Sequence, residues 1–285
     1  MVTLLDGRIV QDSLLKELSQ DVSALKKGGI EPQLTVLMVG AEAASEVYVG
    51  HKEKAAEKVG IKFELKKLPE SISQEALLKV IEELNNDKSV NGIIVQLPLP
   101  KHIEVPKIIK AINPYKDVDG FHAYNLGKMF LDPQFEDLAP CTPKGMIKLL
   151  EYYKIDVSGM DAVVIGRSNI VGKPMATMLS NRNATVTLCH SKTKDLKRYT
   201  QDADLIVVAV GKAKFLKADM VKEGAIILDV GIHRLDGNKL VGDADTEKLL
   251  EKNCRVTPVP GGVGPLTVAC LMANTVTAAR KQSKL

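Results

Sequence analysis

The feature that most constrains this chain is an apolar run ending in a glycine, Ala162–Ile165 followed by Gly166, with another glycine six residues later at Gly172. This pattern is typical of a buried strand that turns sharply into a helix. Such a turn points backbone N–H groups and the positive end of a helix dipole at an anion, usually a pyrophosphate. The spacing is not G-x-G-x-x-G, and Arg167 stands where that fingerprint has no particular residue. The sequence therefore predicts a nucleotide-binding turn of unusual form.

The rest of the chain alternates short apolar runs with amphipathic stretches. Strands are expected at 34–39, 62–65, 92–96, 163–165, 185–188, 205–210 and 225–229, and helices at 45–59, 74–85 and 265–279. The last four strand runs are rich in β-branched residues, which is typical of parallel strands buried on both faces. In a chain of 285 residues, this pattern predicts two α/β domains, the second a Rossmann-type nucleotide-binding domain.

Composition argues against several classes of protein. No apolar run approaches the roughly 20 residues that span a bilayer, and no basic region followed by an apolar stretch opens the chain, so neither a membrane span nor a signal peptide is expected. The four cysteines are far apart, with no C-x-x-C pair, so we expect neither disulfides nor a metal site, and a cytoplasmic location. The net charge of +4 suits an anionic small molecule and is too small to predict binding to nucleic acid.

One lysine falls on the inward face of a predicted helix. On a helical wheel, Lys52 shares a stripe with Tyr48 and with Ala55, Ala56 and Val59, whereas the two other lysines of this segment fall opposite. A lysine placed there loses hydration, which disfavours its charged form and allows it to act as a base. The alternative is that Lys52 only lies over apolar neighbours with its ammonium group in water.

Polar groups follow the predicted strand 92–96. Gln96 ends that strand, and the carboxyl ends of parallel strands are where α/β sheets bind ligands. Asp117 and Asp119 lie close together in the segment Asp117–Gly120. The alternative for Gln96 is that its side chain only forms hydrogen bonds within its own loop. The alternative for Asp119-Gly120 is an ordinary turn, although two neighbouring acids can also bind a ligand.

The segment after the predicted strand 185–188 lacks an acid. NAD-binding Rossmann domains place Asp or Glu about 20 residues past the glycines, where it binds the ribose 2′-hydroxyl. Here Ser191 is followed by two lysines, and Arg167 lies upstream. Arginine and serine would bind a 2′-phosphate that a carboxylate would repel, so the sequence favours NADP over NAD. A basic surface loop with no phosphate partner is the alternative.

Two more glycine-containing segments follow. Ile232 comes directly after Asp229-Val-Gly, where its backbone could border the nicotinamide ribose. Gly262 and Pro265 belong to the loop Pro260–Pro265, which precedes the last predicted helix. Glycines allow backbone to approach a ligand closely. Both segments are equally compatible with tight loops.

Eight blocks, in order, carry a resemblance to one family. They read S-x-x-Y-V-x-x-K (45–52), V-Q-L-P-L-P (95–100), K-D-V-D-G (116–120), C-T-P-K-G (141–145), G-R-S-x-x-V-G-x-P (166–174), C-H-S-x-T (189–193), D-V-G-I (229–232) and P-G-G-V-G-P (260–265). Together they resemble the bifunctional methylenetetrahydrofolate dehydrogenase/methenyltetrahydrofolate cyclohydrolases, over nearly the whole chain.

The resemblance implies two reactions at one site. A hydride passes from 5,10-methylenetetrahydrofolate to NADP+, and water then opens the resulting methenyl cation to 10-formyltetrahydrofolate. It also implies a cytoplasmic homodimer acting in one-carbon metabolism and purine biosynthesis. The implied fold has a catalytic domain of residues 1–139 completed by the helix 268–285, an NADP-binding Rossmann domain of residues 140–267, and the active-site cleft between them.

The resemblance also assigns roles to residues. Lys52 matches the catalytic lysine, Tyr48 the tyrosine that packs on the substrate's aromatic ring, and Gln96 the glutamine that holds the lysine. Asp119 matches the carboxylate that binds the pterin, and Gly262 and Pro265 are expected at the substrate. Cofactor contacts are expected from Gly166, Arg167, Ser168, Gly172, Ser191 and Ile232.

The chain departs from the family's pattern at Ala43, Ala56, His233 and Leu266. None of these removes an implied catalytic group, but they leave open the cofactor preference and the ratio of the two activities. A dehydrogenase that lacks the hydrolase step is one alternative, and Lys52 with Gln96 argues against it. A non-catalytic NADP-sensing module is another.

Overall fold

The fold is that of a computed structural model, which describes residues 4–40, 43–235, 237 and 239–284, without the side chains of 43–45. Contacts divide the chain into two compact units, each described here by itself. The Lys52 unit comprises Ser13–Lys128, Gln134–Cys141 and the end of the chain from Val268. The Gly166 unit comprises the described residues up to Asp12, together with Met129–Pro133 and Thr142–Thr267.

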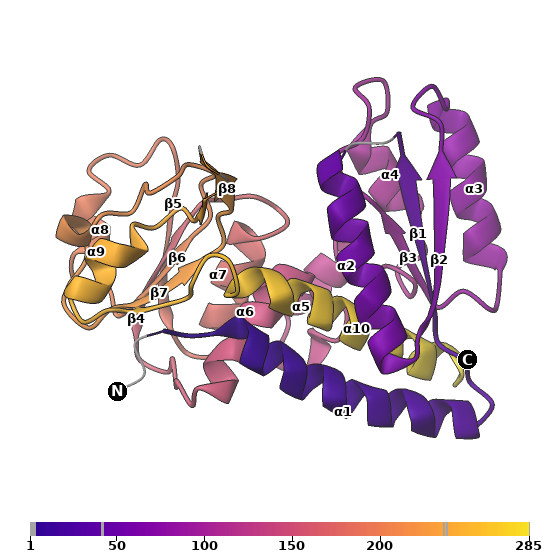
Figure 1. The fold of residues 1–285 in the computed structure, drawn as a ribbon, viewed down its shortest axis with the longest axis horizontal. Coiled ribbons are helices and arrows are strands. Elements are labelled where there is room, and N and C mark those ends of the chain that lie inside the picture. The colour runs from indigo at the N-terminus through magenta and orange to yellow at the C-terminus, as the bar shows by residue number, and fades with distance from the viewer. Residues whose placement is uncertain (1–3, 41–42, 236, 238, 285) are drawn as a thin grey trace. The chain divides into compact units, whose positions relative to one another are not determined.

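The Lys52 unit is built on a three-stranded parallel sheet in the order β2-β1-β3 (Figure 1). Its strands are β1 (Gln33–Val39), β2 (Lys62–Leu68) and β3 (Gly92–Val95), and its helices include α2 (Ala43–Val59), α3 (Gln74–Asn86), α4 (Val105–Ala111) and α5 (Ala123–Met129). The long helices α1 (Gly7–Lys27) and α10 (Val263–Gln282) each begin in the Gly166 unit and continue in this one.

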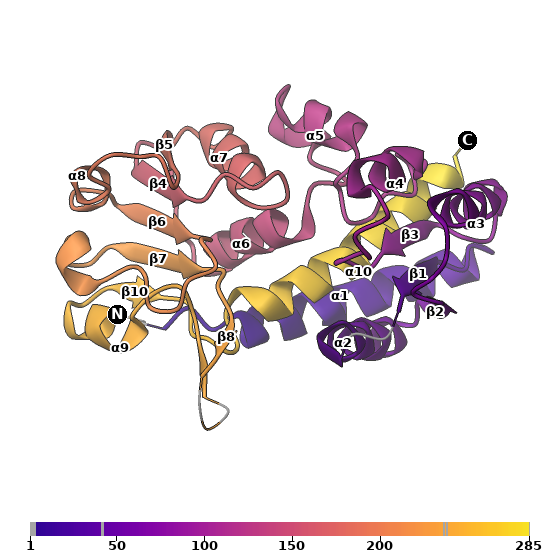
Figure 2. The ribbon, with the colours of Figure 1, turned by 90° about the horizontal axis from the view of Figure 1, so that it is seen from above.

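The central strand β1 has a hydrophobic core on each face. Leu34, Val36 and Met38 pack with α1, α2 and α10, whereas Leu37 and Val39 pack with α3 and α4. This alternation follows from the two-residue period of a strand. Figure 2 shows α3 and α4 on one side of the sheet and the other three helices on the opposite side. Strands β1 and β3 are therefore buried on both faces, whereas every residue of the edge strand β2 is half-buried or exposed.

The Gly166 unit holds a five-stranded parallel sheet in the order β10-β7-β6-β4-β5. Its strands are β4 (Asp161–Ile165), β5 (Thr185–Cys189), β6 (Leu205–Val208), β7 (Ile226–Asp229) and β10 (Arg255–Val256). The chain adds β5 on one side of β4 and then returns to place β6 on the other. Ligands of open α/β sheets bind where the strand order reverses in this way, at the carboxyl end of such a strand, and Gly166 directly follows β4.

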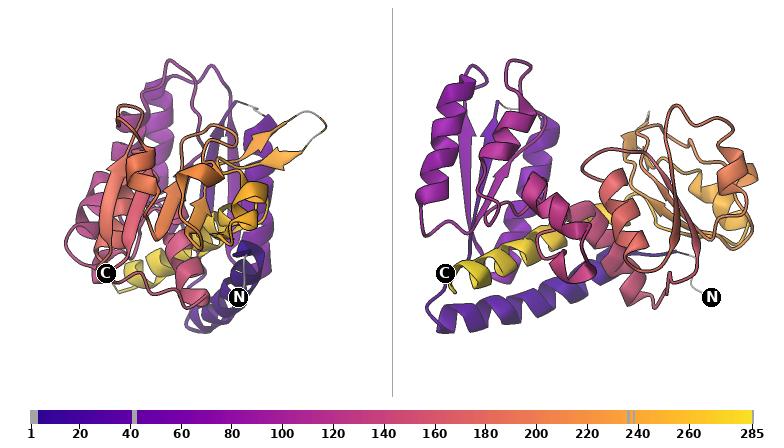
Figure 3. Two further views of the ribbon diagram at one scale, coloured as in Figure 1. Left: turned by 90° about the vertical axis from the view of Figure 1, so that its left-hand side faces the viewer. Right: turned by 180° about the vertical axis from the view of Figure 1, so that it is seen from behind.

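Further elements surround this sheet. They are α6 (Cys141–Tyr152), α7 (Gly172–Ser180), α8 (Lys197–Thr200), α9 (Thr246–Glu251), the short helix η2 (Ala218–Met220), and the antiparallel pair β8 (His233–Arg234) and β9 (Leu240–Val241). The short helix η1 (Pro133–Phe135) belongs mostly to the Lys52 unit. The β8–β9 hairpin projects away from the parallel sheet (Figures 2 and 3). The prediction of two α/β domains with a Rossmann-type second domain is confirmed.

All seven predicted strands are present, with shifted ends. The strand expected at 205–210 stops at Val208, because the N–H groups of Val210 and Gly211 bond to the Asp243 side chain instead of a neighbouring strand. Helix α1 was not among the predicted elements, although Leu15, Leu18 and Val22 supply its buried stripe. Within the described residues no helix has the length and apolar character needed to cross a bilayer.

Candidate active site

Helix α2 places Lys52 at the edge of the core. Ala55, Ala56 and Val59 are buried, Lys52 is half-buried, and the neighbouring charged side chains of the helix are exposed, as the helical wheel predicts. Tyr48, one turn earlier, is 44% exposed. Lys52 Nζ donates a hydrogen bond of 2.8 Å to Gln96 Oε1. The lysine therefore does not simply extend into water; it is tied to the end of a strand.

Gln96 is held by the sheet on which it ends. Its backbone N–H continues the β3–β1 ladder with a 2.8 Å bond to the Leu37 carbonyl. Its side-chain Nε2 donates to the Leu97 carbonyl at 2.8 Å, which leaves Oε1 to accept from Lys52. Because both ends of the amide are engaged, Gln96 fixes the position of the lysine nitrogen. Gln96 thus bonds its own loop, as the alternative expects, and also holds the lysine.

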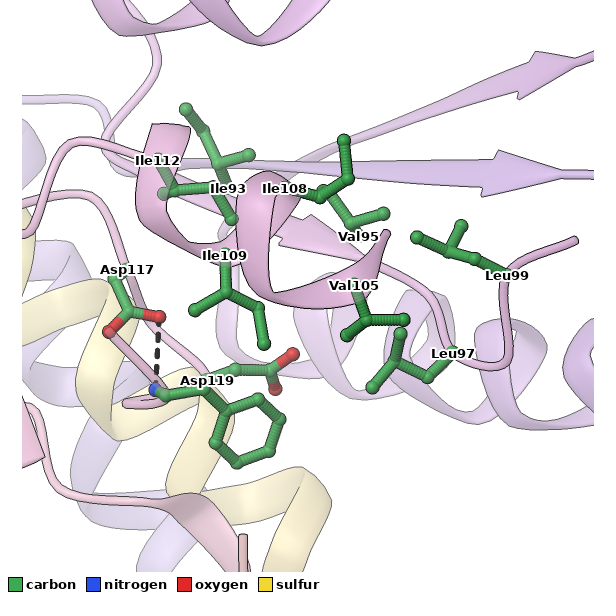
Figure 4. A pocket seen from close by; sticks show the side chains of 11 residues that line it. Ile93, Val95, Leu97, Leu99, Val105, Ile108, Ile109, Ile112, Asp117 and Asp119 are labelled. Carbon is green, nitrogen blue, oxygen red and sulfur yellow. Dashed lines mark hydrogen bonds between the residues drawn. The ribbon is translucent and has the colours of Figure 1, made fainter. Parts of the chain in front are cut away.

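The two neighbouring acids have different environments. Asp117 is 1% exposed and accepts from the backbone N–H groups of Gly120, Phe121 and His122, and from Asn125 Nδ2 at 2.9 Å. These bonds fold the loop that carries Asp119. For the carboxylate of Asp119 itself, no hydrogen bond to another described residue is found. In Figure 4 the two side chains point in different directions, and the dashed line marks the bond from the Phe121 N–H to Asp117.

Electrostatics connect Asp119 to Lys52. Burial raises the pKa of Asp119 from 3.8 to about 6, the charge of Lys52 lowers it in part, and the nearby Asp117 raises it. Desolvation therefore outweighs the attraction of the lysine. Asp119 is a carboxylate that is not saturated by the protein and lies within the field of Lys52. Asp117, by contrast, is part of the scaffold.

A small apolar pocket lies beside Asp119. Its walls are side chains of β3, of α4 and of the loops that follow β3, with Asp117 and Asp119 at one end (Figure 4). Its volume of about 20 Å³ is enough for one water molecule and far too small for a pterin ring. A larger ligand of Asp119 must therefore lie outside this pocket.

The turn after β4 requires both of its glycines. Gly166 has φ +122°, and a Cβ there would lie 2.3 Å from the Ala209 carbonyl oxygen. A Cβ on Gly172 would lie 1.9 Å from the Gly166 carbonyl oxygen. Both contacts are closer than any side chain tolerates, so the backbone itself forms the tight turn that the sequence predicts.

Ser168 lies in the turn that leads into α7. Its Oγ accepts from the N–H groups of Val171 at 3.2 Å and Gly172 at 3.3 Å. Val171, the residue that caps the helix, offers no side-chain hydrogen bond. First-turn N–H groups and the positive end of the helix dipole meet here, which is the arrangement that binds phosphate groups.

The loop after β5 leaves the sheet beside this turn. Ile165 pairs with Cys189, and the Gly166 N–H donates 2.9 Å to the Cys189 carbonyl. The loop is closed by the N–H of His190, which donates to Thr193 Oγ1 at 2.9 Å. The side chains of Arg167 and Ser191 are both exposed. The two loops thus present a cation and a hydroxyl at one edge of the sheet.

The other predicted contacts lie elsewhere in the same unit: Ile232 and Gly262 are in loops, whereas Pro265, expected in a loop, lies in the first turn of α10. Ile232, after β7, is 51% exposed. The loop that holds Gly262 is anchored to the start of α1, because the Gly7 N–H donates 2.8 Å to the Gly261 carbonyl. The Pro265 carbonyl accepts from Gln11 Nε2 at 3.0 Å.

The positions that depart from the family pattern have varied surroundings. Ala56 is fully buried, and Leu266 is fully buried against Gly145. His233 is half-buried, and its Nε2 lies 2.7 Å from Asp243 Oδ1. The side chain of Ala43 lies outside the described residues.

Sequence reasoning missed two features of the site. The resemblance assigned Asp119 to the pterin, but nothing in the sequence indicated the scaffold role of Asp117, and Asp243, which is buried and hydrogen-bonded to the loops after β6 and β7, was not singled out. The dipeptide G-D at 242–243 was the only local indication. No group of three metal-ligating side chains is found among the described residues, and the four cysteines are buried.

Comparison with known proteins adds family matches over both units. Residues 5–119 match the model of the tetrahydrofolate dehydrogenase/cyclohydrolase catalytic domain. Residues 140–283 match that of the tetrahydrofolate dehydrogenase/cyclohydrolase NAD(P)-binding domain.

Individual proteins are similar over the full length. The bifunctional protein FolD of Campylobacter curvus is 52% identical, covering 99% of this chain and 97% of its own. The crystal structure of the FolD enzyme from Campylobacter jejuni is 51% identical, with a TM-score of 0.94 and 99% of each chain covered. The FolD of Trypanosoma brucei, solved with NADP cofactor and inhibitor, is 34% identical, with a TM-score of 0.93 and coverage of 100% of this chain and 99% of that one.

Proposed function

Because this chain belongs to the tetrahydrofolate dehydrogenase/cyclohydrolase family, we propose a role for each site residue in the family's two reactions. The protein is an oxidoreductase and a hydrolase. It oxidises 5,10-methylenetetrahydrofolate to 5,10-methenyltetrahydrofolate with NADP+, and it hydrolyses the product to 10-formyltetrahydrofolate. The bifunctional relatives favour this over a dehydrogenase without the hydrolase step.

The observation that supports the hydrolase assignment is the 2.8 Å bond between Lys52 and Gln96, next to a carboxylate free of other partners in the described chain. Hydrolysis needs a base at the attacking water. We assign that base to the neutral amine of Lys52, which forms when the charged lysine that faces Asp119 gives a proton to solvent. The water oxygen forms a bond to the bridging carbon, and its proton passes to Nζ. The new hydroxyl group then loses its proton as the C=O bond of the formyl group forms and the bond from that carbon to the pterin nitrogen breaks. One of the two water protons ends on that nitrogen, and the other leaves to solvent.

Gln96 and Asp119 prepare Lys52 and the substrate. Gln96 Oε1 holds the nitrogen of Lys52 in one place, so the lysine need not be ordered during the reaction. Asp119, with its pKa of about 6, is ionised at neutral pH. Its carboxylate accepts hydrogen bonds from the N–H groups of the pterin. Tyr48 is exposed on the same side of α2 and packs on the substrate's aromatic ring.

The Gly166 unit binds the cofactor, which supplies the hydride acceptor when bound. The backbone from Gly166 to Gly172 fits a diphosphate, because its two glycines make the turn tight, it leads into the start of α7, and, among the described residues, the one side chain bonded to the N–H groups there is the Ser168 hydroxyl. Arg167 and Ser191 fit a 2′-phosphate, which an acid in their place would repel. Ile232 lies at the nicotinamide end, and Gly262 and Pro265 border the substrate.

We further propose that the protein is a cytoplasmic homodimer acting in one-carbon metabolism and purine biosynthesis. The support is the family resemblance, together with an exposed edge strand, β2, at the end of the smaller sheet. Mass measurement in solution tests the dimer. The expected value is twice the 31.0 kDa of one chain, and a mass of one chain at micromolar concentration would contradict it.

Substitution of the lysine tests the mechanism. Lys52→Met keeps the length of the side chain and removes the base, so methenyltetrahydrofolate supplied directly should no longer be hydrolysed, as followed by its absorbance. NADP+ binding, measured by calorimetry, should survive because it involves the other unit. Lys54→Met is the matched control, since Lys54 is exposed on the opposite face of α2. If Lys52→Met hydrolysed methenyltetrahydrofolate at the wild-type rate, Lys52 would not be the base.

A further inference from the structure

Two buried aspartates of the Gly166 unit have no role in the chemistry above. Asp229 ends β7 and is 1% exposed, and Asp243 follows β9 and is 0% exposed. Buried carboxylates are stable in a fold only when hydrogen bonds or charges satisfy both oxygens. The donors to these two carboxylates come almost entirely from the loops at the carboxyl edge of the sheet.

Asp243 binds two separate loops with one carboxylate. Its Oδ2 accepts from the N–H groups of Val210 at 2.6 Å and Gly211 at 2.9 Å, in the loop after β6. Its Oδ1 accepts from the Lys212 N–H at 2.9 Å and lies 2.7 Å from His233 Nε2. Since a carboxylate can only accept, His233 carries a proton on Nε2. His233 directly follows Ile232, the exposed residue assigned to the nicotinamide end.

Asp229 holds Asp243 in place. Asp229 Oδ1 accepts from the N–H groups of Gly231 and Asp243, both at 2.9 Å, and Oδ2 accepts from the Ala244 N–H at 2.8 Å. The Asp229 N–H donates 2.8 Å to Thr257 Oγ1, in the segment after β10. The bond to Gly231 fixes the backbone on the other side of Ile232. The segment 231–233 is therefore held at both ends, by one aspartate each.

Packing leaves this arrangement no room to shift. A Cβ on Gly231 would lie 2.3 Å from Asp243 Oδ1, and a Cβ on Gly242 would lie 1.9 Å from Asp229 Oδ2. Each carboxylate thus lies directly against backbone, which only glycine permits. Residues 231–233 move only if both aspartates move with them.

We propose that Asp243, with His233 as its side-chain partner and Asp229 as its support, is a positioning residue for the dehydrogenase reaction, because it fixes the backbone of Ile232 at the nicotinamide end of the cofactor. The inference rests on the proposed function, in that Ile232 is taken as a cofactor contact. Hydride transfer depends on the alignment of two carbon atoms, and small misplacements reduce its rate strongly. Hydrolysis of methenyltetrahydrofolate uses Lys52 and requires no hydride transfer. A defect in positioning should therefore lower only the dehydrogenase activity, whereas a general loss of stability should lower both activities.

The test removes the side-chain donor and then restores it. His233→Ala removes one of four bonds to Asp243 at a half-buried site, so the variant should fold. We expect its dehydrogenase kcat to fall by about 10-fold, while the hydrolysis of added methenyltetrahydrofolate and the thermal midpoint remain at wild-type values. His233→Gln places an N–H where His233 Nε2 lies and should recover most of the loss. Leu235→Ala is the matched control, exposed in the same hairpin, and should match wild type in both reactions.

The possible outcomes decide the proposal. Dehydrogenase kcat within about twofold of wild type in His233→Ala would overturn it. A parallel loss of both activities with a lower thermal midpoint would also overturn it, because it indicates a purely structural role. A wild-type enzyme without either activity would instead contradict the proposed function. Asp243→Asn should lose more dehydrogenase activity than His233→Ala, since its amide N–H₂ would face backbone N–H donors; if it does not fold, the His233 variants decide.

Discussion

Replacing Asp119 by asparagine should stabilise the protein while it impairs folate binding. Burial raises the pKa of Asp119 from 3.8 to about 6 in the folded protein. The folded state therefore holds the proton more tightly than the unfolded state, and stability is lost as the pH rises between these values. Since Asp119 is half-buried, solvent screens part of this effect, and at about 1.4 kcal/mol per pKa unit the ionised carboxylate costs the fold about 1–3 kcal/mol at neutral pH. The asparagine side chain has the same shape and stays neutral, so Asp119→Asn should regain about 1–3 kcal/mol there.

Urea unfolding at several pH values measures this gain. Asp119→Asn should exceed wild type in free energy of unfolding near pH 7.5, with the difference closing as the pH falls through 6 towards 4. Asp117→Asn is the matched control two residues away. Burial also raises the pKa of Asp117, but four N–H donors converge on its carboxylate and an amide can no longer accept all of them, so this variant should lose about 1–3 kcal/mol. A gain for Asp119→Asn that is the same at pH 4 and 7.5, or no gain at all, would refute the argument from burial.

Three further substitutions probe the remaining parts. Gln96→Leu removes the acceptor of Lys52 and should lower hydrolysis by about 10-fold or more, with NADP+ affinity unchanged in calorimetry. Arg167→Ala should weaken NADP+ binding by about 10- to 100-fold and NAD+ binding far less; equal losses would mean that the arginine does not contact the 2′-phosphate. Gly172→Ala would place a Cβ 1.9 Å from a backbone oxygen and should abolish cofactor binding, whereas Gly127→Ala, with open space around it, should bind normally.

Local patterns were sufficient to predict the fold. Every residue of β1 is buried. Because both faces of such a strand lie in a core, its sequence is a nearly continuous apolar run, which can be recognised without the structure. The stripe on α2 was equally readable, because the 3.6-residue period places Lys52 with Ala56 regardless of what lies opposite. Helix α1 was missed although its buried leucines repeat at helical spacing.

The partners of the polar side chains were not predictable in the same way. Gln96 is 44 residues from Lys52 in the chain, and only the folded sheet brings the two together. Asp243 binds a histidine 10 residues away and backbone N–H groups 31 to 33 residues away. No local pattern marks such bonds, because the donors are backbone groups that every residue except proline possesses.

The aspartates of this protein show how hydrogen-bond saturation distinguishes scaffold from site. Asp117 and Asp243 are surrounded by backbone N–H donors, so their oxygens have no capacity left for a ligand, and their effect is exerted through the loops they hold. Asp119 is different, because it is desolvated without such donors and only the charge of Lys52 offsets the cost. A fold retains a destabilising carboxylate of this kind when a ligand supplies the missing donors. Bound folate should therefore lower the pKa of Asp119, and folate affinity should fall as the pH drops below about 6 in wild type but not in Asp119→Asn.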